Sequence, residues 1–236
     1  YMMATIVAVF MDGYSFMMFA IGSSIIAAYM YIFFPSKRRF LLRYSSPVHI
    51  ISFAVAYILY ALYIGKTEFA AAALDFFRGW GVDVMFLAVP SKGVLWLWDT
   101  LGLSVTRSGS NQFGDASVWI TTFSLPVIVM GMTAWFFTRK QTKLAYCFLL
   151  VTFFGFYMAL GPSVKLDSVK PEGITSPLME AQYAVAPTGN ALLSEYLPGF
   201  KNMRASYRWV ALGLFGFWLL LVLLLSQTQN KRIKLL

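Results

Sequence analysis

Apolar stretches, each about as long as a membrane-spanning helix, recur along the chain. A transmembrane helix needs about 20 mostly apolar residues to cross a hydrocarbon layer of roughly 30 Å. Five segments meet this requirement: residues 15–34, 48–64, 118–137, 144–161 and 209–226. No segment alternates between apolar and polar positions in the way that a barrel strand does. The pattern therefore predicts an all-α, polytopic helical membrane protein with at least five transmembrane helices.

Two local features refine this picture. Residues 1–11 are also apolar and are expected to be the tail of a preceding helix. Tyr1 starts directly in apolar sequence, without an initiator methionine, a basic n-region or a cleavage site. We therefore expect residues 1–236 to be a single transmembrane domain that is a fragment of a longer protein. Pro126 lies inside the third predicted span, where it removes a backbone hydrogen bond and is expected to kink the helix.

Composition supports a membrane protein and excludes several function classes. Hydrophobic residues make up 59% of the 236 residues and charged residues only 12%, whereas soluble domains have about 45–50% and roughly 25%. Soluble enzymes, disordered chains and collagen-like repeats are therefore excluded. The single cysteine, Cys147, excludes a disulfide framework and any multi-cysteine metal site. Because it lies in an apolar run, we interpret it as an inert buried thiol rather than a nucleophile.

The distribution of positive charge predicts how the chain is oriented. The formal net charge is +9. Ten lysines and arginines lie in residues 35–47, in residues 138–143 and at the C-terminal end, and no acidic residue accompanies them. By the positive-inside rule these segments face the cytoplasm, which makes residues 65–117 and 162–208 external or periplasmic loops. We therefore interpret the charge as orienting a multi-pass protein in the cytoplasmic (inner) membrane, with its C-terminus cytoplasmic, and not as a nucleic-acid-binding surface.

The two external loops are long enough to carry function. Connections above about 12–15 residues are usually functional or disordered, and these contain too many Trp, Phe, Leu and Tyr residues for a disordered linker. Residues 69–80 are expected to form an interfacial helix with Asp75 and Arg78 on its polar edge. The apolar runs at residues 84–89 and 94–98 are too short to span the membrane. We expect them to form either a re-entrant or interface-lying pair of segments, or simple packing at the membrane surface.

Several common signatures are absent from the sequence. It contains no P-loop, no dinucleotide-binding glycine motif, no His/Cys zinc spacing and no nucleophile elbow. His49, the only histidine, lies at the cytoplasmic end of the second span, and we interpret it as an interfacial or capping residue rather than a proton relay. No predicted span has an ionisable residue near its middle, which argues against an ion pump, a proton-coupled carrier or a voltage sensor.

Two groups of charged residues in the external loops are candidates for chemistry. The first loop supplies Asp83 and Asp115. The second loop ends with Lys201, Arg204 and Arg208, whose spacing of three and four predicts one shared helical face at the membrane surface. Such a face can bind a lipid phosphate or pyrophosphate, because arginine offers a planar fork of donors. The alternatives are non-specific contact with anionic headgroups and pairing with loop carboxylates.

Three short motifs resemble a known enzyme class. They read FFRGWGVDVMFLAVPS at 76–91, ALGPS at 159–163 and LPGFKNMRASYRW at 197–209. With the order of spans and loops over roughly residues 70–230, they are similar to the C-terminal half of bacterial polytopic glycosyltransferases of the GT-C class, or to a membrane-protein relative of that class. The matching motif positions are Asp83, Pro90, Pro198, Gly199, Arg204 and Arg208.

The resemblance implies transfer of a sugar from a polyprenyl-phosphate donor to a lipid, glycan or protein acceptor on the external face. Arg204 and Arg208 would then contact the donor phosphate, with Lys201 as an electrostatic helper. Asp83 and Asp115 are the candidate catalytic carboxylates. Members of this class usually carry the catalytic carboxylate in an early external loop, often in an acidic pair that this chain lacks. The main catalytic carboxylate is therefore expected upstream of this chain, and Asp12 is interpreted as a helix-boundary residue.

The implied partners are the lipid bilayer, a polyprenyl-phosphate-linked sugar, and the missing N-terminal helices or a partner subunit, with no nucleic acid. No cofactor and no metal ligand set is assigned, and a requirement for a divalent metal stays open. The competing hypothesis is a non-catalytic membrane scaffold or lipid-handling subunit of a larger complex, which the lack of an acidic pair favours. The long loops and the cationic residues favour the enzyme.

Overall fold

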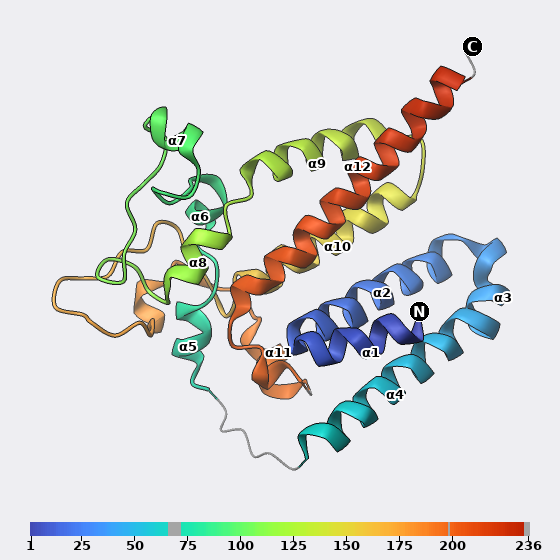
Figure 1. The fold of residues 1–236 in the computed structure, drawn as a ribbon, viewed down its shortest axis with the longest axis horizontal. Helices are drawn as coiled ribbons and strands as arrows, with labels where there is room; N and C mark the ends of the chain where they lie inside the picture. Colours follow the sequence, from blue (N-terminus) through green and yellow to red (C-terminus); the bar gives the residue numbers. More distant parts are fainter. Residues whose placement is uncertain (66–71, 198, 234–236) are drawn as a thin grey trace.

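The computed structural model of the chain describes residues 1–65, 72–197 and 199–233, and it is mostly helical (Figure 1). In chain order the helices and strands are α1 (Met2–Met11), α2 (Gly13–Phe33), α3 (Arg38–Phe40), α4 (Ser46–Ile64), α5 (Leu74–Gly79), α6 (Val84–Ala88), α7 (Trp96–Thr100), α8 (Ala116–Thr121), α9 (Leu125–Thr138), α10 (Leu144–Ala159), β1 (Ser163–Val164), β2 (Ala186–Pro187), α11 (Ala191–Tyr196) and α12 (Val210–Ile233).

The membrane character predicted from the sequence is confirmed at the level of individual helices. Within the residues that the structure describes, three segments are long and apolar enough to cross a membrane: Gly13–Phe33, Pro35–Ile64 and Ser206–Gln227. They contain the second and fifth predicted spans, and the first of them covers the first predicted span up to Phe33. α10 covers most of the fourth predicted span, but it has only 16 residues.

The third predicted span, residues 118–137, is not one kinked helix. The chain forms α8, leaves the helical conformation at residues 122–124 and resumes as α9. Pro126 is the second residue of α9, so it starts a helix instead of kinking one, because N–H groups of the first turn have no intrahelical partner. A backbone group in this break finds a partner within the protein, because the N–H of Ser124 donates a hydrogen bond to the Leu87 carbonyl at 3.0 Å.

The predicted short connection at residues 35–47 is helical. A 3₁₀ turn at Pro35–Lys37, then α3 and a π-helical turn at Leu41–Ser45, lead directly into α4. The guanidinium of Arg38 donates to two carbonyls in the last turn of α2, at 2.7 and 3.0 Å. These bonds satisfy acceptors that a helix end leaves free.

α10 and α12 form the centre of the molecule, and α9 packs against α12 (Figure 1). In the apolar part of Ser206–Gln227, 39% of the residues are buried, compared with 6% in Gly13–Phe33. The two central helices approach closely at glycines, because a Cβ added to Gly155 would lie 2.2 Å from the backbone nitrogen of Gly213. Small residues at such a contact allow apolar helices to pack at short distance.

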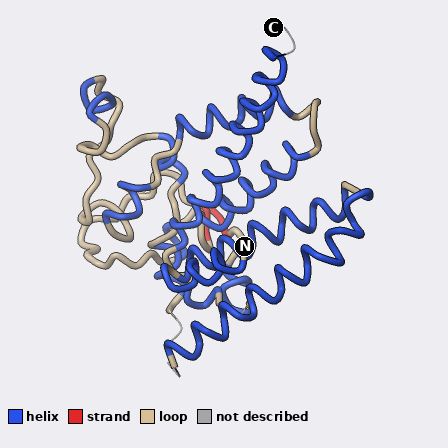
Figure 2. Tube along the Cα trace, turned by 45° about the vertical axis from the view of Figure 1, so that its right-hand side comes forward, coloured by secondary structure: helices blue, strands red, loops and turns tan. Residues whose placement is uncertain are grey.

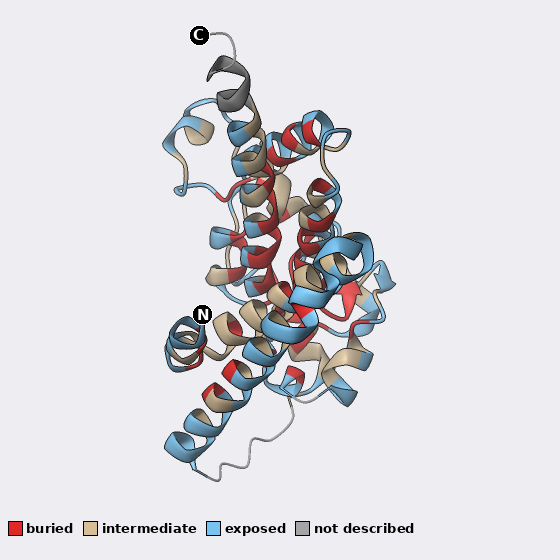
Figure 3. Cartoon of the chain, turned by 90° about the vertical axis from the view of Figure 1, so that its right-hand side faces the viewer, coloured by how far each residue is buried: buried red, intermediate tan, exposed pale blue. Residues whose placement is uncertain are grey.

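α1, α2 and α4 form a second group of helices. α1 and α2 turn back on each other at Asp12, and α1 also packs beside α4. His49 of α4 joins the group, because its Nδ1 lies 2.5 Å from the hydroxyl of Tyr1 and its Nε2 lies 2.9 Å from the hydroxyl of Ser24. In Figure 3 most of α4, the helix that leads to the grey segment, is exposed, whereas buried residues gather around the central helices.

The two long connections lie together at one end of the helices, where the loops and the short β1–β2 pair gather (Figures 1 and 2). Backbone hydrogen bonds join the connections, for example from the N–H of Gly114 to the carbonyl of Pro177 at 2.8 Å and from the N–H of Met179 to the carbonyl of Asp75 at 3.1 Å. α3, the α9–α10 connection and the C-terminal end of α12 lie at the opposite end (Figure 1).

A buried lysine holds the two connections to each other. Lys165 is only 3% exposed, and its Nζ donates to the carbonyl of Arg78 at 2.6 Å and to that of Gly81. Burial lowers the pKa of Lys165 to about 7, although the nearby carboxylate of Asp83 acts in the opposite direction. A buried ammonium is costly unless its hydrogen bonds are satisfied, and for Lys165 these two carbonyls of the first connection supply the acceptors.

Replacing Gly155 with alanine should destabilise the central helices. The added methyl group would lie 2.2 Å from the backbone nitrogen of Gly213, and overpacking of this kind costs about 1–3 kcal/mol. The melting temperature of the purified protein measures the effect. Gly109→Ala is the matched control, because a Cβ there meets nothing within 4 Å. Equal melting temperatures for the two variants would contradict this account of the α10–α12 contact.

Lys165 should make stability rise with pH above neutrality. Its pKa is about 7 in the folded protein and about 10.4 in an unfolded chain. Between these values the unfolded chain binds more protons than the folded protein, so raising the pH favours folding. We expect the free energy of unfolding of the wild type, relative to Lys165→Met, to increase by up to about 1.4 kcal/mol per pH unit in this window. Parallel profiles from denaturation at pH 7 to 10 would show that Lys165 does not titrate there.

Candidate functional site

The three predicted phosphate-binding residues do not lie on one helix. Lys201 belongs to a 3₁₀ turn at Phe200–Asn202, Arg204 follows it in irregular backbone, and Arg208 belongs to a second 3₁₀ turn, Ser206–Trp209. The prediction of a shared helical face is therefore wrong. Core packing sets the backbone conformation of residues 200–209, because the rings of Phe200 and Trp209 at its two ends stack with their centroids 5.9 Å apart and an interplanar angle of 3°.

Arg208 lies at the turn between α1 and α2. Its Nη1 is 3.7 Å from Oδ1 of Asp12, and its guanidinium carbon is 5.0 Å from the ring centroid of Tyr14. The hydroxyl of Tyr14 accepts a hydrogen bond from the backbone N–H of Ala205, so the same tyrosine positions the backbone that carries the arginine. Asp12 does stand at a helix boundary, as predicted, and in addition it pairs with Arg208.

Arg204 is positioned by two aromatic rings from the first connection. Its guanidinium carbon lies 5.0 Å from the ring centroid of Phe76, and Phe76 stacks on Trp80 at 4.0 Å with an interplanar angle of 7°. The indole N–H of Trp80 donates to Oδ2 of Asp115 at 2.9 Å, and its carbonyl accepts from the N–H of Tyr207 at 2.9 Å. The aromatic pair therefore connects Arg204 to a carboxylate 89 positions away in sequence.

Asp115 is an exposed carboxylate with a defined orientation. It caps the start of α8, where Oδ1 accepts from the backbone N–H of Ser117 at 2.9 Å. Burial raises the pKa of Asp115, but hydrogen bonds from Ser117 and Trp80 and the positive charge of Arg208 together outweigh burial and lower it. The group is therefore ionised at neutral pH, and it can accept hydrogen bonds from a substrate or act as a weak base.

Asp83 is enclosed, in contrast to Asp115. It is 1% exposed and caps the start of α6, where Oδ1 accepts from the N–H of Met85 at 2.9 Å. The N–H groups of Asp167 and Ser168 also donate to its carboxylate, at 2.9 and 2.8 Å. A substrate hydroxyl would have to displace these donors. The arrangement favours a structural role for Asp83 instead of the predicted catalytic one.

Lys201 and Arg204 line a groove together with residues of α1, α2 and α4. The groove has a volume of about 790 Å³. Its lining is mainly apolar and aromatic, with polar residues from the turn after α11; it includes Val9, Phe16, Met17, Tyr57, Tyr60, Lys201, Asn202 and Arg204. This arrangement offers an apolar surface for a hydrocarbon chain and cationic donors for a headgroup. Pro198, named in the motif, lies outside the described residues.

The site contains residues that sequence reasoning did not select. Tyr14, Phe76 and Trp80 each fix the position of a charged residue, yet aromatic residues are so frequent in this chain that none stood out. Within residues 1–65, 72–197 and 199–233, no three His, Cys, Asp or Glu side chains come together as a possible metal site.

No family model, no curated protein and no solved structure matches this chain. Two features of the molecule bear on its function. One is the groove lined by Lys201 and Arg204, and the other is the group of Asp12, Asp115 and Arg208, in which the arginine pairs with Asp12 and helps to lower the pKa of Asp115.

Proposed function

We propose that this protein is a membrane glycosyltransferase that transfers a sugar from a polyprenyl-phosphate donor to a lipid, glycan or protein acceptor outside the cytoplasmic membrane. The observation that carries the proposal is the groove that combines a mainly apolar lining with the cationic side chains of Lys201 and Arg204. A polyprenyl phosphate has the same division into an apolar chain and an anionic head. The similarity of the short motifs to the GT-C class supports the reaction type.

In the proposed reaction an acceptor hydroxyl oxygen attacks the anomeric carbon of the sugar, and the bond from that carbon to the phosphate oxygen breaks. The electron pair of the broken bond leaves on the phosphate, and a carboxylate takes the hydroxyl proton. Arg204 and Lys201 would stabilise the charge on the leaving phosphate. Arg208, which lies between Asp12 and Tyr14, would add to the positive potential.

Asp115 is the better placed of the two predicted carboxylates, because it is exposed and lies within the electrostatic reach of Arg208. Its lowered pKa makes it a weak base. The proposal therefore gives Asp115 the task of orienting the acceptor.

The proposal includes five crossings, with α9 and α10 added to the three long apolar segments. Residues 65–117 and 162–208 are then external, and the C-terminus is cytoplasmic. The support is the separation of the long connections from the basic segments at opposite ends of the helices (Figure 1), together with the positive-inside rule.

A non-catalytic lipid-handling subunit or membrane scaffold is the second candidate. The observation that favours it is the pairing of Arg208 with Asp12, which occupies an arginine predicted to contact phosphate, while Asp83 is enclosed. Such a protein would bind a lipid phosphate in the same groove but transfer no sugar. Measurement of turnover separates the two candidates.

The orientation can be tested with single cysteines at Thr106 and Gln141, both exposed, in a Cys147→Ala background. An impermeant thiol reagent applied to intact cells, with the outer membrane permeabilised where there is one, should label Thr106→Cys and not Gln141→Cys. Both should react after the cytoplasmic membrane is opened. Labelling of Gln141→Cys alone in intact cells would invert the orientation.

Arg204→Lys should reduce sugar transfer by about 10–100-fold, because lysine keeps the charge but loses the planar fork of donors. Arg208→Lys should reduce it less, because Arg208 is proposed to act through its charge, which lysine keeps. The measurement is transfer of a radiolabelled sugar from polyprenyl-phosphate-linked donors by the purified protein in nanodiscs, with melting temperature as the folding control. Arg39→Lys is the matched control, since Arg39 is exposed at the opposite end of the helices.

Two outcomes would change the assignment. If both variants transfer sugar at the wild-type rate, the arginines only anchor the protein to headgroups. If the wild type binds polyprenyl phosphate but transfers no sugar from any donor, the lipid-handling subunit is the correct function.

A further inference from the structure

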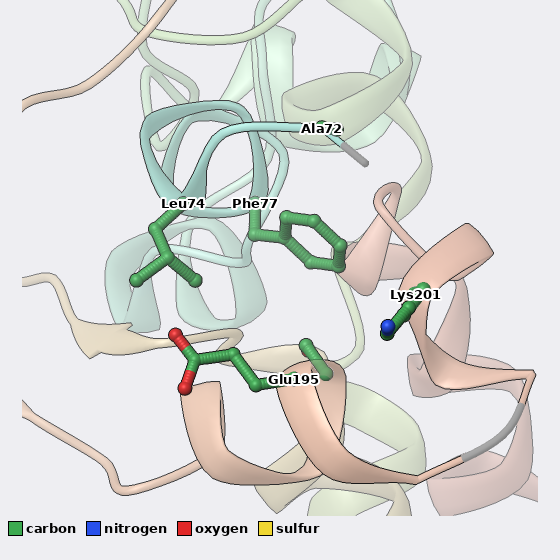
Figure 4. A pocket seen from close by; sticks show the side chains of 6 residues that line it. Ala72, Leu74, Phe77, Glu195 and Lys201 are labelled. Atoms are coloured by element: carbon green, nitrogen blue, oxygen red, sulfur yellow. The ribbon is translucent and has the colours of Figure 1, made fainter. Parts of the chain in front are cut away.

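A second, smaller cavity shares two lining residues with the groove. It has a volume of about 270 Å³, and it lies between α5, α11 and the turn that carries Lys201. Figure 4 shows the side chains that line it: Ala72, Leu74, Phe77, Ser194, Glu195 and Lys201. Ala72 and Lys201 also line the larger groove, so the two spaces meet at Lys201. We call this space the Glu195 pocket.

The Glu195 pocket combines an apolar wall with polar groups that are open to a ligand. Leu74 and Phe77 of α5 form the apolar side, and Glu195 and Lys201 lie across the space from them (Figure 4). Among the described residues, no side chain forms a hydrogen bond or an ion pair with Glu195 or Lys201. Both side chains are exposed, which leaves a carboxylate acceptor and an ammonium donor for a bound molecule.

This chemistry fits a single sugar ring. A pyranose presents C–H groups on its faces and hydroxyl groups around its edge, so it can contact the Phe77 side and donate hydrogen bonds to a carboxylate at the same time. Pockets for drug-sized ligands have volumes of about 300–1,000 Å³. At about 270 Å³, the Glu195 pocket is suited to one monosaccharide and not to a longer glycan.

The order of the two spaces matches the order of groups in the donor. In a polyprenyl-phosphate sugar the phosphate stands between the hydrocarbon chain and the ring. Lys201 likewise stands between the apolar groove and the Glu195 pocket, since it lines both. We propose that the Glu195 pocket is the sugar subsite of the donor, with the phosphate at Lys201 and the carboxylate of Glu195 accepting hydrogen bonds from the sugar hydroxyls.

This subsite rests on the proposed function, and it assigns recognition of the sugar to α11. Glu195 is a binding residue in this arrangement, distinct from the carboxylate that takes the acceptor proton. The hydrocarbon chain and the phosphate would be bound identically whether or not a sugar is attached. Loss of Glu195 should therefore affect only the sugar-bearing lipid.

The test compares the binding of undecaprenyl phosphate with that of its glucose, mannose and N-acetylglucosamine esters, using the purified protein in nanodiscs. We expect at least one ester to bind more tightly than undecaprenyl phosphate. Glu195→Ala should weaken binding of that ester by about 10-fold, the size expected for a hydrogen bond to a charged group. It should leave the affinity for undecaprenyl phosphate unchanged.

Two further variants make the result specific. Ser194→Leu should fill the Glu195 pocket and weaken binding of the ester alone. Glu172→Ala removes an exposed carboxylate from the same connection and should weaken neither ligand. Melting temperatures of the variants check folding.

Each other outcome identifies what has failed. If Glu195→Ala weakens both ligands equally, or if no ester binds more tightly than undecaprenyl phosphate, the sugar subsite is overturned while the lipid-phosphate groove stands. If neither undecaprenyl phosphate nor any ester binds to the wild type, the proposed function and the subsite are overturned together.

Discussion

An ammonium group that is taken out of water has to find its hydrogen-bond partners inside the protein, and Lys165 finds them in the other long connection. Its Nζ donates to carbonyls of Arg78 and Gly81. Asp83 provides the reciprocal interaction, because it belongs to the first connection and accepts from two backbone N–H groups of the second. Each connection thus satisfies a buried charge of the other. If one connection moved while the charged group of the other stayed buried, that group would lose hydrogen-bond partners.

The candidate site depends on this coupling. α5 ends at Gly79, between Arg78 and Gly81, whose carbonyls accept from Lys165. These hydrogen bonds therefore hold Phe76 and Trp80 where they can contact the segment before α12. Arg204 lies against the ring of Phe76, and Asp115 accepts a hydrogen bond from the indole N–H of Trp80. Tyr14 completes the arrangement from the opposite side, because its hydroxyl accepts from the backbone N–H of Ala205. Arg204, Arg208 and Asp115 therefore each have an aromatic neighbour that helps to orient them.

The same packing explains why the spacing of Lys201, Arg204 and Arg208 was misleading. A spacing of three and four places side chains together only on a continuous helix. Here Phe200 and Trp209 stack in the core, and two 3₁₀ turns with irregular backbone between them accommodate that stack. Lys201 and Arg204 consequently line the groove, whereas Arg208 lies beside Asp12. The two ends of the segment therefore lie in different surroundings, one in the groove and the other beside a carboxylate.

The sequence by itself determined the helical membrane class and the positions of most long helices. Apolarity over about 20 residues is a property of each segment alone, and it requires no knowledge of the neighbours. The sequence also offered five candidate site residues: Asp83, Asp115, Lys201, Arg204 and Arg208. The tertiary structure decided which of these groups are accessible and which lie together. Asp83 and Asp115 both cap short helices in the same connection, yet three backbone donors and burial enclose the first, and the second stays exposed. The pairing of Asp12 with Arg208 joins residues 196 positions apart. Such contacts depend on how the chain returns to itself, because burial and charge pairing are set by neighbours that are distant in sequence.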